Sequence, residues 1–357
     1  MKYHADNLQA LASAILMAFG CNRQETGIVA DHLVRANLAG HDSHGIGMLP
    51  MYGLQVKDGN LIPNQQADVA PACGAVTLVD ARRGFGHRMA LIALDAAVKT
   101  CREHKVAVLG LRNSGHVSRT GHYSEYCASK GLISLHFVNV WGHPPIVAAH
   151  GSCQPGFSTN PISIGIPMNG EAKPMLDLAT STVAFGKVRV AHNRGEKIPV
   201  GWVIDDAGNA TQDPGPMAEQ RVGALTPFGQ HKGSGLAIFV ELLAGAIAGK
   251  ETVAHGTHLP NGVLNNLFSV LIDPQAFDTQ EQIEARVMEF YQSIKSSKKA
   301  NDAEQVLMPG EPELNHRTDR LTNGIDVDQE TIEQLLSTGE NFGLNRKELV
   351  MLLETSG

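Results

Sequence analysis

The chain has 357 residues, of which 43% are hydrophobic and 18% are charged, and its formal net charge is −7. This composition is typical of a globular protein of about two domains and excludes a disordered chain. The acidic balance, without a long basic run, argues against a surface for nucleic acid or for an anionic membrane. We also expect no signal peptide and no membrane-spanning helix, because no window approaches about 18 continuous apolar residues. The five cysteines are scattered without a CxxC pair, which predicts free thiols in a reducing cytoplasm and neither disulfides nor a zinc site.

Both ends of the chain are predicted to be helical. Apolar residues recur at helical spacing near each end, and Gly40 is expected to end the second helix. A stretch rich in Pro and Asn, residues 59–70, is expected to be extended. We therefore predict one helical domain built from residues 1–72 together with 308–357. Its helices are expected within 5–39, 50–56, 329–336 and 346–353.

Residues 73–307 form the second predicted domain, in which strand and helix patterns alternate. This alternation is typical of an α/β sheet layered with helices. The strands are expected over 75–79, 106–111, 132–138, 174–178, 200–204 and 268–272, and the helices over 88–103, 121–130 and 234–248.

The sequence contains no convincing dinucleotide fingerprint of the Rossmann type. Gly84-Phe85-Gly86 lies between a predicted strand and a predicted helix, but the third glycine position is occupied by Met89. A methionine is too large for close helix packing there, and two arginines precede the turn. We therefore interpret this stretch as a turn between strand and helix that needs glycine. A phosphate-binding GxxxxGK[ST] loop is also absent from the sequence.

Two of the 16 histidines, His44 and His116, lie in predicted loops rich in small polar residues. Histidine is the usual proton carrier in carbonyl–alcohol interconversion, because its pKa lies near neutral pH. A hydroxyl such as that of Ser43 could hold the carbonyl oxygen. The alternative is an ordinary loop histidine bonded to the backbone. The spacing of His41 and His44 would also suit a metal, but no HExxH helix accompanies it, and we expect no metal site.

Two further segments are candidates for binding a nucleotide. The predicted strand ending at Asp177 is followed by Thr180 and Ser181, which would suit a contact with a ribose or an amide. The alternative is that Thr180 or Ser181 caps a helix running to Lys187. In the second segment, residues 228–235, Lys232 and several glycines precede the long apolar helix. Free N–H groups at a helix start, beside a lysine, form an anion site that could hold a pyrophosphate. Here the alternative is a flexible helix entry.

Taken together, these motifs occur in an order that resembles the type-2 malate/L-lactate dehydrogenase family, and most of all its hydroxycarboxylate dehydrogenases. The resemblance covers nearly the whole chain. The motifs are His41 to Ile46, Asn113 to Gly121, Asn160-Pro161, Asp177 to Ser181 with Gly186-Lys187, His231 to Gly233, Pro309 to Glu311, Arg317 and Gly324-Ile325.

The resemblance implies an α/β nicotinamide-binding fold that is not Rossmann, with a mixed sheet flanked by helices. It also implies a homodimer, NAD or NADP as cofactor, and proton transfer by His44 and His116. We favour His44 as the proton donor, with Ser43 orienting the carbonyl and His116 as the second histidine, although the order could be swapped. The residues expected to contact the cofactor are Asn139, Leu176, Asp177, Leu178, Ala179, Thr180, Ser181, Thr182, His231, Lys232, Pro309, Gly310 and Glu311.

The chain departs from the family pattern at two positions. Many relatives carry an arginine where this chain has Met48, and such an arginine would pair with the substrate carboxylate. The carboxylate must then find another cation, for which Arg119 and Arg112 are candidates, or the pocket is more apolar. The second departure is Ser118, where the family usually has glycine, so the loop around His116 differs or gains a hydrogen bond.

We therefore expect an NAD(P)-dependent enzyme that interconverts small 2-hydroxy acids and 2-oxo acids. One alternative is a reductase of cyclic imines, which also occurs in the family. A histidine-rich metal-dependent hydrolase is a second alternative, and a non-catalytic binding module is a third. The sequence does not indicate the preferred acid or the choice between NADH and NADPH.

Overall fold

The computed structural model describes residues 1–70, 73–253, 258–300 and 305–354. Helices and sheets enclose three separate hydrophobic cores. This architecture confirms the predicted α/β class. The predicted domain boundary at residue 72 lies outside the described residues, and the division into two domains stays a prediction.

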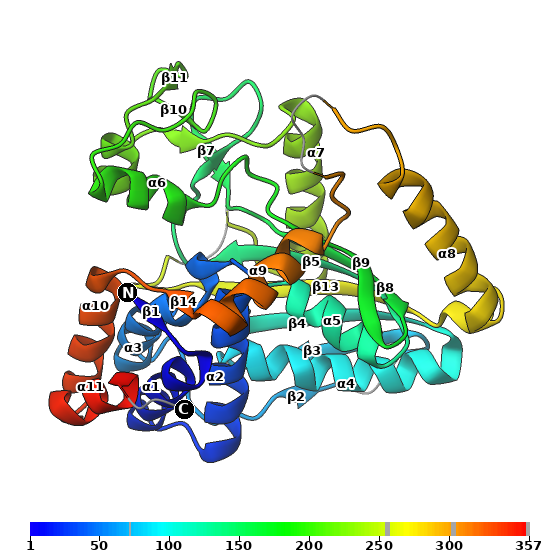
Figure 1. Cartoon of the computed structure of the whole chain (residues 1–357), viewed down its shortest axis with the longest axis horizontal. Coiled ribbons are helices and arrows are strands. Elements are labelled where there is room, and N and C mark those ends of the chain that lie inside the picture. Colours follow the sequence, from blue (N-terminus) through cyan, green and yellow to red (C-terminus); the bar gives the residue numbers. More distant parts are fainter. Residues whose placement is uncertain (71–72, 254–257, 301–304, 355–357) are drawn as a thin grey trace.

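The helices near the two ends of the chain pack into one layer around a shared core (Figure 1). Strand β1 (Lys2–Tyr3) pairs antiparallel with β14 (Ile325–Asp326) and joins the start of the chain to its C-terminal part. Gly40 follows the second helix with a φ of 83°, a conformation that glycine adopts without strain, so its predicted role is confirmed. The layer comprises α1 (Ala5–Ala18), α2 (Arg23–Leu38), α3 (Leu49–Lys57), α10 (Gln329–Glu340) and α11 (Arg346–Glu354).

A seven-stranded sheet forms the centre of the molecule. Among the described strands, β3 and β4 pair in parallel and all the other pairs in this sheet are antiparallel, so the sheet is mixed as expected. Its order is β2 (Asp68–Val69), β3 (Val76–Asp80), β4 (Val106–Gly115), β13 (Leu264–Ile272), β5 (Ile133–Trp141), β8 (Ile162–Met168) and β9 (Glu171–Leu178).

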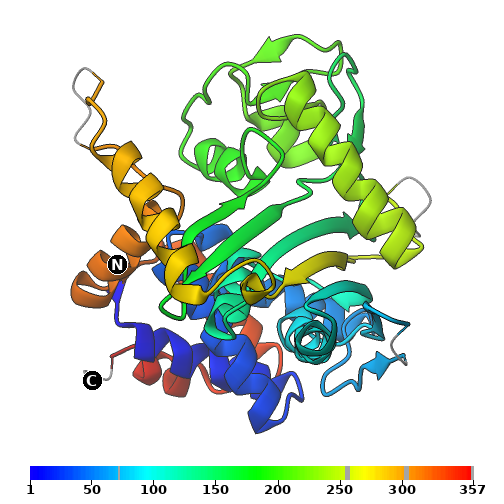
Figure 2. The same ribbon diagram turned by 90° about the vertical axis from the view of Figure 1, so that its right-hand side faces the viewer.

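Helices cover both faces of this sheet (Figures 1 and 2). Helices α4 (Gly86–His104) and α5 (Gly121–Ser129) pack on one face through the second core. Helix α7 (His231–Val240) continues into a π-helix, η4 (Glu241–Gly249), which lies on the other face. Gly110 of β4 shows how close this packing is, because an added Cβ atom would lie 3.2 Å from Ala248.

The structure also contains a small lobe with its own hydrophobic core. The sequence analysis did not distinguish this lobe from the rest of the predicted α/β domain. It contains a five-stranded sheet whose strands have only two or three residues, too few for a periodic pattern. Its elements are β6 (Val147–Ala148), β7 (Pro155–Phe157), β10 (Val203–Ile204), β11 (Ala210–Thr211), β12 (Ala224–Leu225), α6 (Phe185–Asn193) and the π-helix η3 (Pro216–Gln220). Two polar helices, α8 (Gln280–Lys295) and α9 (Glu311–Asn323), were also missed.

The interpretation of Thr180 or Ser181 as a helix cap is wrong. Helix α6 begins at Phe185, after Ala184. The Thr180 hydroxyl donates instead to the carbonyl of Thr159, at 2.9 Å, and the Ser181 hydroxyl donates to the carbonyl of Val183. Both side chains therefore tie the end of β9 to neighbouring loops and leave the start of α6 uncapped by either of them.

The turn at Gly84 to Gly86 is confirmed as a turn between a strand and a helix, and the structure shows why it needs glycine. A Cβ atom on Gly86 would lie 2.2 Å from the carbonyl oxygen of Gly115 and 2.4 Å from that of His116. Close approach of the two backbones, rather than an unusual φ, therefore excludes a side chain at Gly86.

One helix of the described chain, His231–Gly249, is long and apolar enough to cross a membrane by length and composition alone. The sequence analysis did not anticipate this. About 44% of that window is buried within the structure, and the helix packs on the sheet. A core helix passes the same test, so this single helix is weak evidence for a membrane span.

Candidate active site

His44 ends a short 3-10 helix, η1 (Asp42–His44), that the side chain of Asn37 holds in place. The Asn37 amide donates to the Asp42 carboxylate at 2.7 Å, and its oxygen accepts the N–H of Ile46 at 2.9 Å. Gly45 leaves room for this arrangement, because a Cβ atom there would lie 2.1 Å from the Asn37 oxygen. The loop that carries His44 is therefore fixed by a buried residue of α2.

The side chain of His44 faces two of the residues expected to act with it. Its Nδ1 lies 3.0 Å from the hydroxyl of Ser43, and its ring stacks on that of His116 with centroids 5.7 Å apart. Ser118 donates from its hydroxyl to the carbonyl of His44 at 2.8 Å, and its φ is 59°. This backbone conformation explains why glycine would be favoured at Ser118, and the expected additional hydrogen bond is present.

His116 is held by a tyrosine that the sequence analysis did not single out. The hydroxyl of Tyr52, which is buried in α3, lies 2.9 Å from Nδ1 of His116. Burial lowers the pKa of His44 to about 4 and that of His116 well below its usual value. Both imidazoles are therefore neutral at pH 7 and can accept a proton.

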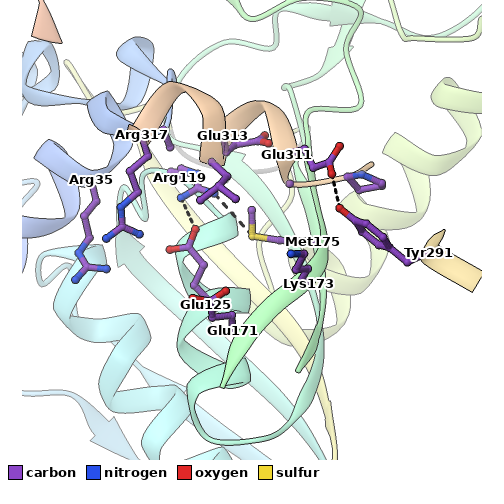
Figure 3. Close-up of a pocket in the computed structure, with 14 residues that line it drawn as sticks. Arg35, Arg119, Glu125, Glu171, Lys173, Met175, Tyr291, Glu311, Glu313 and Arg317 are labelled. Carbon is purple, nitrogen blue, oxygen red and sulfur yellow. Dashed lines mark hydrogen bonds and ion pairs between the residues drawn. The ribbon is translucent and has the colours of Figure 1, made fainter. Parts of the chain in front are cut away.

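Asp177 and Arg119 form a buried ion pair near His44 (Figure 3 shows Arg119). Nε of Arg119 donates to Asp177 at 3.1 Å, and a second nitrogen donates to Glu125 at 2.8 Å. The other Asp177 oxygen accepts the hydroxyl of Thr120 at 2.8 Å. Both carboxylate oxygens of Asp177 thus have protein partners, and Arg119 is already paired with two carboxylates. Their expected contacts with ribose and with substrate stay predictions.

The two predicted nucleotide-binding segments lie next to each other. The N–H of Phe228 donates to the carbonyl of Thr180 at 3.0 Å, and Thr182 donates to the carbonyl of Thr226 at 2.8 Å. Helix α7 begins three residues after Phe228, at His231, and exposed Lys232 lies in its first turn. The end of β9 and the start of α7 therefore share one surface.

That surface reaches the catalytic loop through the small lobe. A Cβ atom on Gly186 would lie 3.3 Å from the Cβ of Ser43, which places the start of α6 against the His44 loop. The segment between Thr182 and Gly186 therefore connects the candidate cofactor surface with the candidate catalytic residues.

The predicted segment at Pro309 lines two adjoining pockets beside β9. Figure 3 shows the first of them. The Pro309 carbonyl accepts the N–H of Met175 at 3.2 Å. The first pocket has a volume of about 180 Å³ and includes Arg119 and Glu311, while Leu176 and Asp177 line the second. Gly310 lines both pockets. Leu176, Asp177 and the segment Pro309–Glu311, all predicted to contact the cofactor, therefore lie close together.

Several predicted site residues already have structural partners. The amide of Asn139, on β5, donates to Glu241 at 3.1 Å, and its oxygen accepts from Asn266 at 3.1 Å. The Glu311 carboxylate accepts from Lys295 at 2.8 Å. These contacts hold η4 and the Pro309 loop in position. Contacts of Asn139 and Glu311 with a cofactor stay predictions.

The remaining predicted residues occupy different surroundings. Met48 packs against the core of the helical layer. The ring of His231 lies 6.0 Å from that of His150, and Leu178 pairs with Ile162 in the sheet. Within the described residues, no group of three His, Cys, Asp or Glu side chains is arranged to hold a metal. The described part of the chain therefore offers no set of metal ligands that would support the alternative of a metal-dependent hydrolase.

Buried histidines are expected to make the protein less stable in mild acid. His87 and His136 are fully buried, and burial lowers the pKa of each to about 3. Below about pH 6.5 the unfolded chain takes up protons at these positions and the folded chain does not, so stability falls as the pH falls. Each histidine should lower the free energy of unfolding by about 1.4 kcal/mol at pH 5.5 relative to pH 8.

Urea unfolding at these two pH values measures the effect. Replacing His136 by glutamine should reduce the difference between pH 8 and pH 5.5 by about 1.4 kcal/mol. An unchanged difference would contradict a neutral, buried His136.

Comparison with known proteins identifies the family of this chain. The sequence profile of the family described as malate/L-lactate dehydrogenase matches residues 3–336. The chain belongs to this family. Hydroxycarboxylate dehydrogenase B of Escherichia coli is 36% identical over 353 residues, which cover 98% of this chain and 96% of that protein. The family and the resemblance to its hydroxycarboxylate dehydrogenases, both expected from the sequence, are thus confirmed.

Solved structures of similar proteins share the fold over nearly the whole chain. The sulfolactate dehydrogenase of Methanocaldococcus jannaschii has a TM-score of 0.86 and 31% identity, covering 98% of this chain and 100% of that one. The delta1-piperideine-2-carboxylate reductase of Pseudomonas syringae has a TM-score of 0.78 and 28% identity, covering 95% and 99%. The family places this protein among the oxidoreductases of 2-hydroxy and 2-oxo acids and implies a nicotinamide cofactor.

Proposed function

We propose that this protein interconverts a small 2-hydroxy acid and its 2-oxo acid with NAD or NADP, using His44 and His116 for proton transfer. The observation that carries the proposal is the stacked pair of neutral imidazoles, 5.7 Å apart, one of which lies in a loop whose Ser43 lies against Gly186 of α6. To interconvert a carbonyl and an alcohol, the protein needs a group that carries a proton to or from the oxygen atom. The histidine pair would be this group.

The residues present fit a dinucleotide. The start of α7 places the positive end of the helix beside the exposed side chain of Lys232, which is an arrangement suited to phosphate. Oδ1 of Asn160 is buried without a partner, while Asn160 itself lies against Thr180. A buried acceptor without a partner is costly, and the carboxamide of a nicotinamide has the N–H groups to satisfy it. When bound, the cofactor would supply or accept the hydride.

The protein groups would act as follows. Ser43 would orient the carbonyl oxygen, and His44 would donate a proton to that oxygen during reduction. During oxidation a neutral His44 is the base that is needed, because its pKa of about 4 keeps it unprotonated. During reduction the same low pKa keeps both imidazoles neutral. The proton that His44 donates to the substrate must therefore be replaced from another source.

A panel of 2-oxo acids, assayed at the nicotinamide absorbance with NADH and with NADPH, tests the proposal. Turnover of at least one small 2-oxo acid with either cofactor is expected. No turnover of any 2-oxo acid, despite binding of NADH seen by fluorescence, would contradict the enzymatic function and favour a binding module.

Reduction of cyclic imines is a second candidate. The structural likeness to a delta1-piperideine-2-carboxylate reductase supports it. Adding cyclic imines to the substrate panel separates the two functions.

Replacing Lys232 by alanine should weaken cofactor binding about tenfold, which corresponds to about 1.4 kcal/mol, because a charged hydrogen bond to phosphate is lost. The rate at saturating cofactor should change little, since Lys232 would contact the cofactor far from the reacting atoms. Fluorescence titration with NADH measures the dissociation constant. Lys130→Ala, an exposed lysine whose ammonium lies over Tyr126, is the matched control. Equal binding by the two variants would exclude a phosphate contact by Lys232.

The expected homodimer is supported by an apolar face on α7 and η4. Leu236, Phe239, Leu242 and Ile247 of this face are 36–67% exposed. Apolar side chains grouped in this way are typical of protein interfaces. Light scattering of the purified protein should give about twice the mass of one chain. A mass of one chain at micromolar concentration would contradict the dimer.

A further inference from the structure

Helix α9 has no buried residue, and one of its faces lies along the segment that leads to His44. Glu313, His316 and Arg320 follow one another at intervals of three and four residues, which places them on the same side of a helix. Each of the three contacts the stretch of chain between the end of α2 and η1. The function proposed above assigns no role to this face of α9.

The first two contacts place α9 beside Gly40 and His41. Nε2 of His41 lies 3.4 Å from Oε1 of Glu313. A Cβ atom on Gly40 would lie 2.7 Å from Cδ2 of His316, so the backbone there comes as close to α9 as glycine allows. The chain therefore runs against α9 as it leaves α2 and enters η1.

Arg320 makes the third contact, with the side chain of Asp42. Its two terminal nitrogens donate to the two carboxylate oxygens of Asp42, at 2.6 and 2.9 Å. One of these nitrogens also donates to the backbone carbonyl of Asn37, in the last turn of α2. A cation is favourable at this end of a helix, where backbone carbonyls lack partners within the helix. Arg320 thus joins the end of α2 to the start of η1.

The ion pair of Arg320 and Asp42 differs from an isolated pair on the surface, which contributes little. The Arg320 side chain is only 16% exposed, and Asp42 also accepts the Asn37 amide at 2.7 Å. A bidentate guanidinium within such a network fixes the direction of its carboxylate as well as its distance. Lysine lacks this planar fork and cannot hold Asp42 and the Asn37 carbonyl in the same way.

Polar contacts of this kind matter for η1, because core packing does not hold it. It has three residues, of which Asp42 and Ser43 are exposed and His44 is half-buried. Ser118 holds the C-terminal end of η1 through the carbonyl of His44, at 2.8 Å. Arg320 holds the N-terminal end through Asp42. The direction of the His44 ring therefore depends on a contact at each end of η1.

We propose that Arg320 is a positioning residue for His44. The proposal rests on the function proposed above, in which His44 exchanges a proton with the substrate oxygen. Arg320 holds Asp42 and thereby keeps η1 in one conformation. In this conformation the His44 ring stacks on His116, and its Nδ1 faces the hydroxyl of Ser43. A displacement of about 1 Å at a reacting group can lower a rate about 10²-fold, so a contact two residues from His44 can control kcat.

Arg320→Ala should lower kcat for 2-oxo acid reduction about tenfold or more, because the imidazole loses its fixed position. KM and the dissociation constant of NADH should change less than about twofold. The midpoint of urea unfolding should stay close to that of the wild type, since a half-exposed ion pair adds little stability. A wild-type kcat, or a parallel loss of kcat, NADH binding and stability, would overturn the proposal.

Arg346→Ala is the matched control for this variant. Arg346 also donates to two carboxylate oxygens on the helical layer, but they belong to Glu333 and Glu340 rather than to Asp42. Its replacement removes a comparable network of charges and should leave kcat unchanged. An equal loss of kcat in the two variants would mean that any damage to the helical layer slows the reaction, and would overturn the specific role of Arg320.

A double variant separates positioning from a general loss of structure. In a protein that already lacks the His44 imidazole, Arg320 has nothing left to position. Arg320→Ala should therefore cause no further decrease in the residual kcat of His44→Ala. A further decrease as large as in the wild-type background would show that Arg320 acts independently of His44, and would overturn the proposal.

The ion pair is open enough to solvent for chemical rescue, because the Asp42 side chain is 49% exposed. Millimolar methylguanidine should raise kcat of Arg320→Ala, whereas sodium chloride at the same ionic strength should not. Arg320→Lys should keep more activity than Arg320→Ala, since an ammonium still binds Asp42 at one point. Failure of both methylguanidine and lysine to recover activity would contradict a role through Asp42.

A measurement on the cofactor-free protein keeps this proposal separate from the proposed function. In protein labelled with ¹⁵N-histidine, Arg320→Ala should shift the ring-nitrogen resonances of His44. Those of His136, which is buried and bonded to Ser269, should stay unchanged. An unmoved His44 resonance would overturn the proposal. If the wild type reduces no 2-oxo acid, the proposed function fails, and this measurement still decides whether Arg320 holds the His44 loop.

Discussion

Replacing His44 by alanine is expected to lower kcat for oxo-acid reduction by about 10²-fold or more, because the proton carrier at the carbonyl oxygen is removed. Cofactor binding should stay nearly intact. The His44 side chain contacts Ser43 and His116, whereas the segments proposed for the cofactor hold together through Thr180, Thr182 and their own partners. Steady-state kinetics and NADH fluorescence measure the two effects separately.

His41→Ala is the matched control for this experiment. His41 lies in the same loop, but its Nε2 faces Glu313 at 3.4 Å rather than the histidine pair. Its replacement should lower kcat by less than about tenfold if only the reacting imidazole matters. A parallel loss of kcat and of NADH binding in His44→Ala would argue that His44 holds the loop instead of carrying a proton.

The sequence indicated His44 and His116 because both lie in stretches of small polar residues that match motifs of the family. Sequence patterns also predicted α3, α4 and α5 with bounds close to those observed, and a helical stretch over 5–39 that α1 and α2 occupy. Local signals of this kind depend on neighbours a few residues apart. They are therefore readable in one sequence without knowledge of the fold.

Features that depend on distant contacts were not readable in the same way. Tyr52 meets His116 across 64 positions, and in the sequence it is one apolar residue of a short helix. Arg119 and Asp177 were assigned to different ligands because their pairing, across 58 positions, appears only when α5 packs on β9. The small lobe was missed because its sheet joins segments of two or three residues from five places in the chain.

The Arg119–Asp177 pair also gives the largest expected effect on stability. Arg119→Met should lower the free energy of unfolding by about 3–5 kcal/mol, because it leaves a buried carboxylate without its cation. The Asp177 side chain is only 5% exposed, and its remaining bond would be the one from Thr120 at 2.8 Å. Glu125, whose side chain is 33% exposed, can turn to solvent and should contribute little. Urea unfolding at pH 7 measures the loss.

The double variant Arg119→Met/Asp177→Leu is the decisive control, because it removes both charges of the pair. It should recover most of the stability lost in Arg119→Met, since apolar side chains of similar size can replace a buried ion pair at little cost. If the double variant were as unstable as the single one, the loss would come from packing around Arg119. The same single variant tests the substrate role: a large rise in KM for 2-oxo acids, beyond the loss of folded protein, would mean that Arg119 also binds the substrate carboxylate.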